Sequence, residues 1–174
     1  MNEINSEVIH SAAQGDQKAF KALYDHYNEY VWAVIYRASN GDIEMAKQIM
    51  QDVFVKVHRS LKKFRFQSAF STWLFRITYT TSSSRLKKRG LFNKRHEELT
   101  DQTEDKKSFA SEDRMFLNHI LRSLSSQERF LLVAREVNNM SFDELAQITG
   151  KSEGALRTQV HRLKNQLRKG YTYE

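Results

Sequence analysis

The 174-residue chain contains no cysteine, no proline and only 6 glycines. The absence of cysteine excludes disulfide bonds, thiolate metal ligands and cysteine nucleophiles. Because proline and glycine mark tight turns and interrupt helices, their scarcity favours helices joined by short loops over a sheet with many turns. We therefore expect an all-α protein.

Long apolar segments are also lacking. No run approaches the roughly 20 apolar residues that a membrane span requires. Residues 1–5 have neither the basic start nor the apolar stretch of a signal peptide. We therefore expect a cytoplasmic protein with no membrane insertion.

Acidic residues are missing from one long interval. The chain has a formal charge of +7, and a basic protein often has a polyanionic partner. Between Asp52 and Glu97 there are 12 Lys and Arg, many aromatic residues and no acid. Cations that follow a phosphate backbone, mixed with aromatics that stack on unpaired bases, are typical of single-strand binding. Such a run repels itself unless a polyanion neutralises it, so we expect nucleic acid as a partner.

Charge divides the chain into three segments. Residues 1–89 contain 14 Lys and Arg against 8 Asp and Glu, a net charge of +6. Residues 90–113 contain 4 against 7, a net charge of −3, and have almost no periodic apolar pattern. Residues 114–174 contain 10 against 6, a net charge of +4. We predict two small helical domains joined by a flexible acidic linker over 90–113.

Apolar residues recur at helical spacing in the first domain. They predict a helix over residues 20–35 that Asp16 caps, a turn at 39–42 and a second helix over 46–61. A third helix is expected from Ser71 to Ser84, although its second half is nearly all Thr and Ser, which are weak helix formers.

Capping signals are clearer in the second domain. Ser125-x-x-Glu128 and Ser141-x-x-Glu144 both match the capping box, so a helix should begin at each. Gly150 can adopt the left-handed conformation that ends a helix, and Ser152 can cap the next one. The stretch 142–161 therefore predicts a helix-turn-helix.

The helix after Ser152 has two different faces. Its apolar face consists of Leu156, Val160, Leu163 and Leu167. The other face is basic and hydrogen-bonding, which suits the DNA major groove. The residues predicted to contact DNA there are Ser152, Arg157, Thr158, His161, Arg162 and Lys164. An ordinary amphipathic helix with a solvated charged face is the alternative.

From about residue 15 to residue 168, the chain resembles a minimal bacterial sigma factor of the extracytoplasmic-function (ECF) group in the sigma-70 family. Gly15-Asp16-x-x-Ala19-Phe20 resembles the opening helix of that family, and Gln51-Asp52-Val53-Phe54 resembles its polymerase-binding segment. Phe64-Arg65 and the stretch 68–77 resemble the promoter-melting region, and residues 125–168 resemble the second conserved domain with its helix-turn-helix.

The resemblance implies partners and sites. Core RNA polymerase would contact Gln48, Gln51, Asp52, Phe54 and Val55. The unpaired −10 element of promoter DNA would contact Phe64, Arg65, Phe66, Gln67, Ser68, Trp73, Arg76, Tyr79 and Thr80. The helix from Ser152 would read the −35 duplex. Sigma factors of this group are often bound by an anti-sigma factor, which is therefore a candidate partner. We expect no catalysis, no metal and no cofactor.

Several positions depart from the family pattern. Lys47-Gln48 stands where an acidic pair is usual, and Phe66 stands where glycine is usual. Tyr79, Thr80 and Ser84 replace a typical Arg, Asn and Asp, and Ser125-Ser126 replaces a pair of prolines.

The sequence also bears on three other functions. A helix-turn-helix regulator that binds duplex DNA without docking on polymerase is supported by Lys47-Gln48. An enzyme acting on nucleic acid is not supported, because the sequence contains no paired carboxylates, His/Asp cluster or glycine-rich phosphate loop. A structural adaptor does not account for the basic interval.

Overall fold

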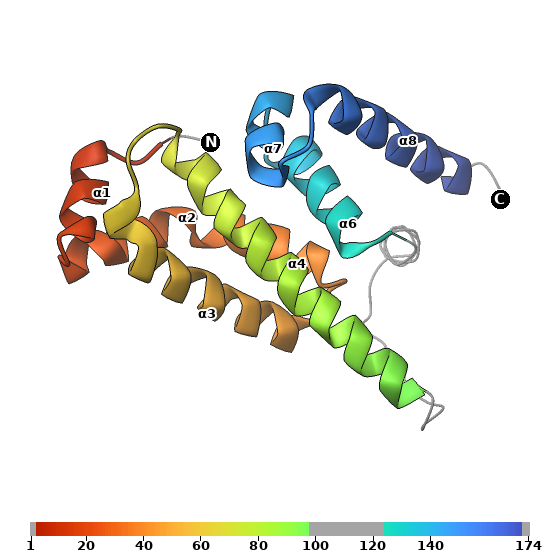
Figure 1. Cartoon of the computed structure of the whole chain (residues 1–174), viewed down its shortest axis with the longest axis horizontal. Helices are drawn as coiled ribbons and strands as arrows, with labels where there is room; N and C mark the ends of the chain where they lie inside the picture. Colours follow the sequence, from red (N-terminus) through yellow and green to blue (C-terminus); the bar gives the residue numbers. More distant parts are fainter. Residues whose placement is uncertain (1–2, 98–123, 172–174) are drawn as a thin grey trace.

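The computed structural model describes residues 3–97 and 124–171, and the side chains of 3–90 and 124–168 within these ranges. Every regular element in the described ranges is helical, which confirms the all-α prediction (Figure 1). Residues 98–113 of the predicted linker and 114–123 of the predicted second domain lie outside the described residues.

Each of the first three helices is capped by the side chain of an Asn or Asp directly before it, namely Asn5, Asp16 and Asp42. The helices are α1 (Ser6–Ala13), α2 (Gln17–Ala38) and α3 (Ile43–Ser60), and a short 3₁₀ turn, η1 (Leu61–Lys63), follows. Asp16 caps α2 as predicted, because its carboxylate accepts from the Lys18 and Ala19 amides at 2.8 and 3.2 Å. The predicted turn at 39–42 is confirmed, and α1 is an element that the apolar pattern did not predict.

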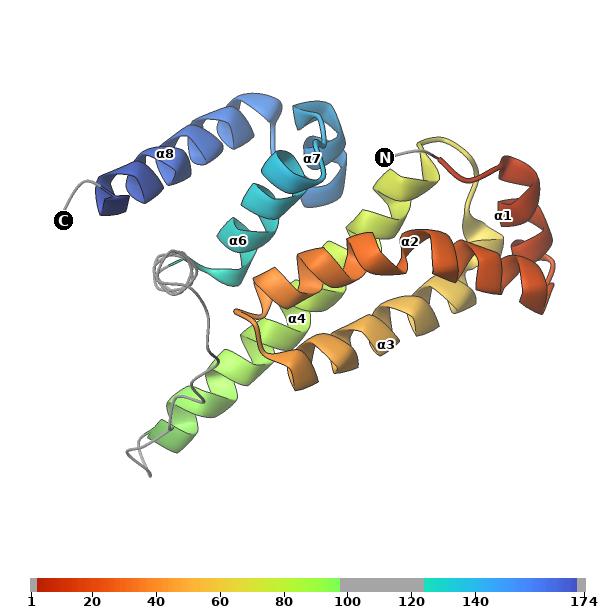
Figure 2. The same ribbon diagram turned by 180° about the vertical axis from the view of Figure 1, so that it is seen from behind.

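Helix α4 (Phe70–Glu97) is longer than predicted. It continues past Ser84, and its last residues, 90–97, were predicted to be flexible linker; that part of the prediction was wrong. The Thr/Ser-rich middle is helical because tertiary contacts compensate its weak propensity. Thr78 and Thr81 are buried, and the Lys56 ammonium on α3 donates to the Thr81 hydroxyl at 3.1 Å. Figures 1 and 2 show the end of α4 extending beyond α2 and α3.

The second domain contains α6 (Ser126–Leu132), a π-helical segment η2 (Val133–Val137), α7 (Phe142–Thr149) and α8 (Glu153–Tyr171). Both predicted capping boxes are present, at the starts of α6 and α7. Gly150 ends α7 with φ of 73°, in the left-handed region that favours glycine. The helix-turn-helix is thus built as its local signals predict.

The two domains pack against each other. Val34 of α2 and Phe75 of α4 are fully buried in the core cluster of the second domain. The Tyr79 and Phe130 rings lie 4.8 Å apart, and the Arg129 Nε donates to the Ala38 carbonyl at 3.2 Å. In both views α6 and α7 lie beside α2 and α4 (Figure 2). The linker prediction did not anticipate this shared core.

Candidate nucleic-acid and polymerase interfaces

Helix α8 buries one face and exposes the other. Leu156, Val160 and Leu163 are buried against the rest of the domain. The six residues predicted to contact DNA lie outside this apolar face, and five are exposed, namely Ser152, Arg157, Thr158, His161 and Arg162, while Lys164 is half-buried. The Ala155 amide donates to the Ser152 hydroxyl at 3.3 Å, so Ser152 caps the helix.

Carboxylates and an aromatic ring hold the cations of this face. Arg157 donates to Glu153 at 3.0 Å, and its guanidinium lies 4.6 Å from the centroid of the Phe142 ring. Arg162 pairs with Glu128 at 3.4 Å. Exposed ion pairs of this kind contribute only about 0–1 kcal/mol. They orient the side chains, and a phosphate or base edge can replace the carboxylates at little cost.

Glu128 links the capping box of α6 to this basic face. Partial burial raises the pKa of Glu128, but hydrogen bonds from the Ser125 backbone and hydroxyl and the charges of Arg162 and Lys151 outweigh it, so the pKa lies below its usual value. The carboxylate therefore stays ionised and keeps Arg162 near α6.

An open depression of about 520 Å³ lies along the N-terminal half of α8. It is lined by Lys151, Gly154, Ala155, Thr158, Gln159 and Arg162. The Lys151 ammonium donates to the Gln159 amide oxygen at 2.9 Å. Sequence reasoning missed Lys151 and Gln159, although Gln159 falls in the first turns of the predicted reading helix.

The loop of residues 64–69 joins η1 to α4 and carries an exposed aromatic ring. Phe66 is 50 % exposed, and its backbone has φ of 55°. Its ring lies 4.8 Å from Phe64, which in turn lies 5.2 Å from Trp73 on α4. Arg65 and Gln67 are exposed beside it, and Ser68 is half-buried. The structure thus brings the predicted −10 loop and the start of α4 together.

Along α4 the remaining predicted −10 residues lie on two faces. Trp73, Arg76 and Thr80 are spaced by three and four residues, so they share one side of the helix, and Arg76 and Thr80 are exposed. Tyr79 lies instead against Phe130 of the second domain, and this burial raises its pKa although a hydrogen bond from Ser83 opposes the shift. The structure therefore separates Tyr79 from the other −10 residues.

The basic interval is neutralised in part by α3. Arg85 pairs with Asp52 at 2.5 Å, and Arg89 pairs with Asp42. These acids precede the interval in sequence, so the charge pattern did not reveal the pairing. We expected that only a polyanion could neutralise the positive charge of this interval. For Arg85 and Arg89 that expectation was wrong, because acids of the same chain pair with them.

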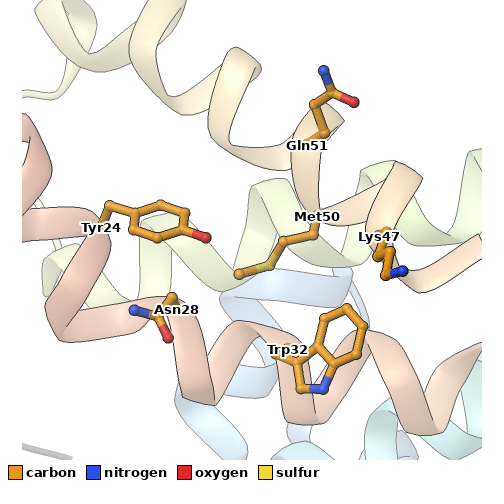
Figure 3. A pocket seen from close by; sticks show the side chains of 6 residues that line it. All are labelled: Tyr24, Asn28, Trp32, Lys47, Met50 and Gln51. Carbon is orange, nitrogen blue, oxygen red and sulfur yellow. The ribbon is translucent and has the colours of Figure 1, made fainter. Parts of the chain in front are cut away.

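The face predicted to bind polymerase borders an open groove between α2 and α3, with a volume of about 500 Å³ (Figure 3). Its lining residues are Tyr24, Asn28, Trp32, Lys47, Met50 and Gln51. Figure 3 shows the Met50 side chain between the rings of Tyr24 and Trp32. Sequence reasoning missed the α2 side, whose residues 24, 28 and 32 recur every four positions.

The five predicted polymerase-contact residues are not equivalent. Gln48, Gln51 and Val55 are exposed. Asp52 is half-buried in its pair with Arg85. Phe54 is only 7 % exposed and packs against Tyr24 at 4.6 Å, so it supports α3 from inside.

Comparison with known proteins identifies the family. The Sigma-70 region 2 family model matches residues 23–91, and the Sigma-70 region 4 model matches residues 117–167. Together the two matched ranges cover more than half of the chain. The chain is a sigma factor of the extracytoplasmic-function group.

Its relatives match along nearly their whole length. It is 28% identical over 170 residues to the ECF RNA polymerase sigma-E factor of Escherichia coli (strain K12), covering 89% of this chain and 87% of the relative. It is 25% identical to the sigma-E factor of Haemophilus influenzae, covering 92% and 91%. The fold matches that of the sigma factor RpoE from Bartonella quintana, solved in complex with the anti-sigma factor NepR, with a TM-score of 0.73, 22% identity and coverage of 90% and 99%.

As a sigma factor, the protein binds core RNA polymerase and promoter DNA and directs transcription initiation. Two of its departures from the family pattern now have a structural context. Phe66, where glycine is usual, occupies the left-handed backbone region. Lys47, where an acid is usual, pairs with Glu44 at 2.8 Å one turn earlier on α3.

In the part of the sigma factor that the structure describes, no group of three or more His, Cys, Asp or Glu side chains is placed to hold a metal ion. Among the described helices, none combines the length and apolar character that a membrane crossing needs.

Proposed function

We propose that this sigma factor contacts its partners through three separate surfaces. The exposed face of α8 reads the −35 duplex, the loop 64–69 with one side of α4 captures the opened −10 strand, and the α2–α3 groove docks on core polymerase. Catalysis of bond formation stays with the polymerase, so the sigma factor makes and breaks no covalent bond. It acts in the cytoplasm, where core polymerase works.

The observation that best supports the −10 surface is the backbone of Phe66. A bulky residue rarely adopts a positive φ, and holding one there costs about 1–3 kcal/mol. Its ring is nevertheless 50 % exposed rather than packed in the core. Strain retained at an exposed aromatic points to a role in binding, and stacking on a flipped base contributes about 1–3 kcal/mol.

The Phe66 variants separate stacking from stability. Phe66→Gly removes the ring and also relieves the left-handed strain, so thermal stability should stay level or rise. Phe66→Ala removes the ring but keeps a side chain at positive φ. Both should slow open-complex formation on paired promoter DNA about fivefold or more, as loss of one stacked base predicts.

The measurement is permanganate footprinting on a paired template and on one already mismatched at −10, beside a melting curve. The mismatched template should largely rescue both variants, because its opening cost is already removed. Tyr30→Ala, which removes another exposed ring from α2, is the matched control. Normal opening by both Phe66 variants would contradict the stacking role.

Polymerase docking is tested best at Gln51. Asp52→Arg would also break the pair with Arg85 and place two cations together, so a loss there would be ambiguous. Gln51 is exposed at the edge of the groove, so Gln51→Arg should weaken core binding at least tenfold without lowering the melting temperature. Binding to labelled core polymerase measures this, with Gln14→Arg, at the exposed C-cap position after α1, as control. Equal affinity of the two variants would contradict docking at this groove.

An anti-sigma factor is a further partner that we propose. It is supported by the fold match to a sigma factor solved with its anti-sigma factor. A second solved structure with the same fold, CnrH in complex with the cytosolic domain of CnrY, has a TM-score of 0.66, 24% identity and coverage of 92% of both chains.

A further inference from the structure

The residue directly before helix α4 cannot cap the helix with its side chain. Ala69 precedes the helix, and its carbonyl accepts from the Trp73 amide at 3.2 Å. Its methyl side chain has no atom that can accept a hydrogen bond. The Ser68 hydroxyl donates to the Ala69 carbonyl at 3.3 Å. The first amides of α4, which need acceptors from outside the helix, therefore depend on another part of the chain.

Glu3, which lies near the start of the sequence, supplies those acceptors. The Phe70 amide donates to its Oε2 at 3.1 Å, and the Ser71 amide donates to its Oε1 at 3.3 Å. A carboxylate at this place also interacts favourably with the positive end of the helix dipole. Glu3 is thus the N-cap of α4, supplied from 67 residues away.

A buried tyrosine fixes the position of this carboxylate. The Tyr27 hydroxyl donates to Glu3 Oε2 at 3.3 Å and accepts from the Ile4 amide at 3.3 Å. The Tyr27 side chain is fully buried, and burial, with the nearby Glu3 charge, raises its pKa to about 12. The hydroxyl therefore remains a protonated donor toward Glu3 over the whole physiological range.

A series of aromatic contacts connects Tyr27 to the exposed loop of residues 64–69. Tyr27 lies 5.4 Å from Phe70, and Phe70 lies 5.4 Å from Phe64. Phe64 in turn lies 4.8 Å from Phe66. Each ring restricts the next, so the orientation of the exposed Phe66 depends on where α4 starts.

We propose that Glu3 is a positioning residue for promoter melting: by capping α4 from a distance, it fixes the point at which the −10 loop enters the helix. This rests on the proposed role of the loop in binding the opened strand. Glu3 itself touches no DNA; it acts through the first turn of α4 and through Phe70.

The test compares three full-length variants. Glu3→Ala removes both acceptor oxygens. Glu3→Gln keeps one acceptor oxygen but replaces the other with an NH₂ group, which cannot accept from the Phe70 and Ser71 amides. Glu7→Gln removes the same charge from an exposed position on α1 and is the control. Hydrogen exchange at the Phe70 and Ser71 amides measures the cap, and open-complex formation with core polymerase on paired and −10-mismatched templates measures positioning.

We expect Glu3→Ala to speed exchange at these two amides about tenfold and to slow opening on the paired template about threefold to tenfold. Glu3→Gln should show a smaller change in the same direction, and Glu7→Gln should show none. Binding to a −35 duplex alone should be unchanged. The mismatched template should recover most of the lost rate.

A rescue variant separates positioning from a general loss of stability. Ala69 is exposed, so Ala69→Asp can supply a local cap, and in the Glu3→Ala background it should restore both slow exchange and opening. The proposal is overturned if Glu3→Ala opens promoters normally, or if it fails equally on both templates without rescue. If Phe66→Ala and Phe66→Gly also open normally, the proposed role of the loop fails instead.

Discussion

The two helices that we propose to contact DNA obtain their N-terminal caps from different places. Helix α8 is capped by Ser152, the residue directly before it, and α7 before it by its own capping box. Helix α4 is capped by Glu3, which belongs to a different segment of the domain. Each start satisfies orphan amides with oxygen acceptors, but one is local and the other requires the folded domain.

The packing of the two helices shows the same contrast between local and distant partners. The apolar face of α8 packs within its own domain, through Leu156, Val160 and Leu163. Helix α4 is held by ion pairs to α3, and its Phe75 is buried in the core of the second domain. The start and packing of α8 are therefore set mostly within its own domain, whereas α4 depends on contacts with residues as distant as Glu3 and Phe130.

Phe75→Ala should have the largest effect. The side chain is fully buried, so its removal should lower the free energy of unfolding by about 3–5 kcal/mol. Because Phe75 lies in the core of the second domain, the two domains should also lose their coupling. Urea unfolding followed by circular dichroism and by tryptophan fluorescence, which reports on Trp32 and Trp73 in the first domain, should then give two separate transitions.

A matched control is Phe20→Ala, which removes a half-buried ring that packs only in the first core. It should lower stability while the two probes still report one transition. If Phe75→Ala also leaves the transitions coincident, α4 does not couple the domains.

Arg157→Ala should have an intermediate effect, confined to α8. If Arg157 reads a base edge, the variant should lose about 1–3 kcal/mol of −35 binding, and the loss should depend on the −35 sequence. Fluorescence anisotropy on a set of duplexes measures it. Lys151→Ala is the contrast, since a phosphate contact should weaken all sequences equally. A uniform loss for Arg157→Ala would make it a phosphate contact, and no loss would remove this helix from the groove.

Ser141→Ala should have the smallest effect and the most local one. Loss of this cap should cost about 0.5–2 kcal/mol and speed amide exchange in the first turn of α7. Exchange at the start of α4 should not change. Ser6→Ala, at the first residue of α1, whose cap comes from Asn5, is the control. Faster exchange at Phe70 in the Ser141 variant would show that the caps are not independent.

In the described part of the second domain, residues 124–171, the starts of all three α-helices could be predicted from the sequence, but η2 could not. The capping boxes, Gly150 and the two-faced α8 are all signals within a few residues of the feature that they specify. The exposure of the α8 face opposite Leu156, Val160 and Leu163 followed from the same local pattern, and its contact with DNA stays a prediction. The Lys151–Gln159 side of the depression was missed because its shape depends on how α8 packs.

In the first domain, prediction succeeded where signals were local and failed where they were distant. Asp16 and the 39–42 turn were found, but the cap and length of α4 were not. A Thr/Ser-rich stretch has weak propensity, and the contact of Lys56 with Thr81 is invisible in a linear pattern. The position of Tyr79 against Phe130 was equally hidden.

The sequence by itself determined the helical class, the helix-turn-helix, the sites of most helix starts and the family, because caps, periodicity and motif order act over short distances along the chain. Only the tertiary structure decided how far α4 extends, which acids balance its cations, that Phe66 is held at positive φ and that Glu3 caps α4. The ion pairs and the cap join residues 33 to 68 positions apart, and their energy exists only once the chain has folded to bring the partners together.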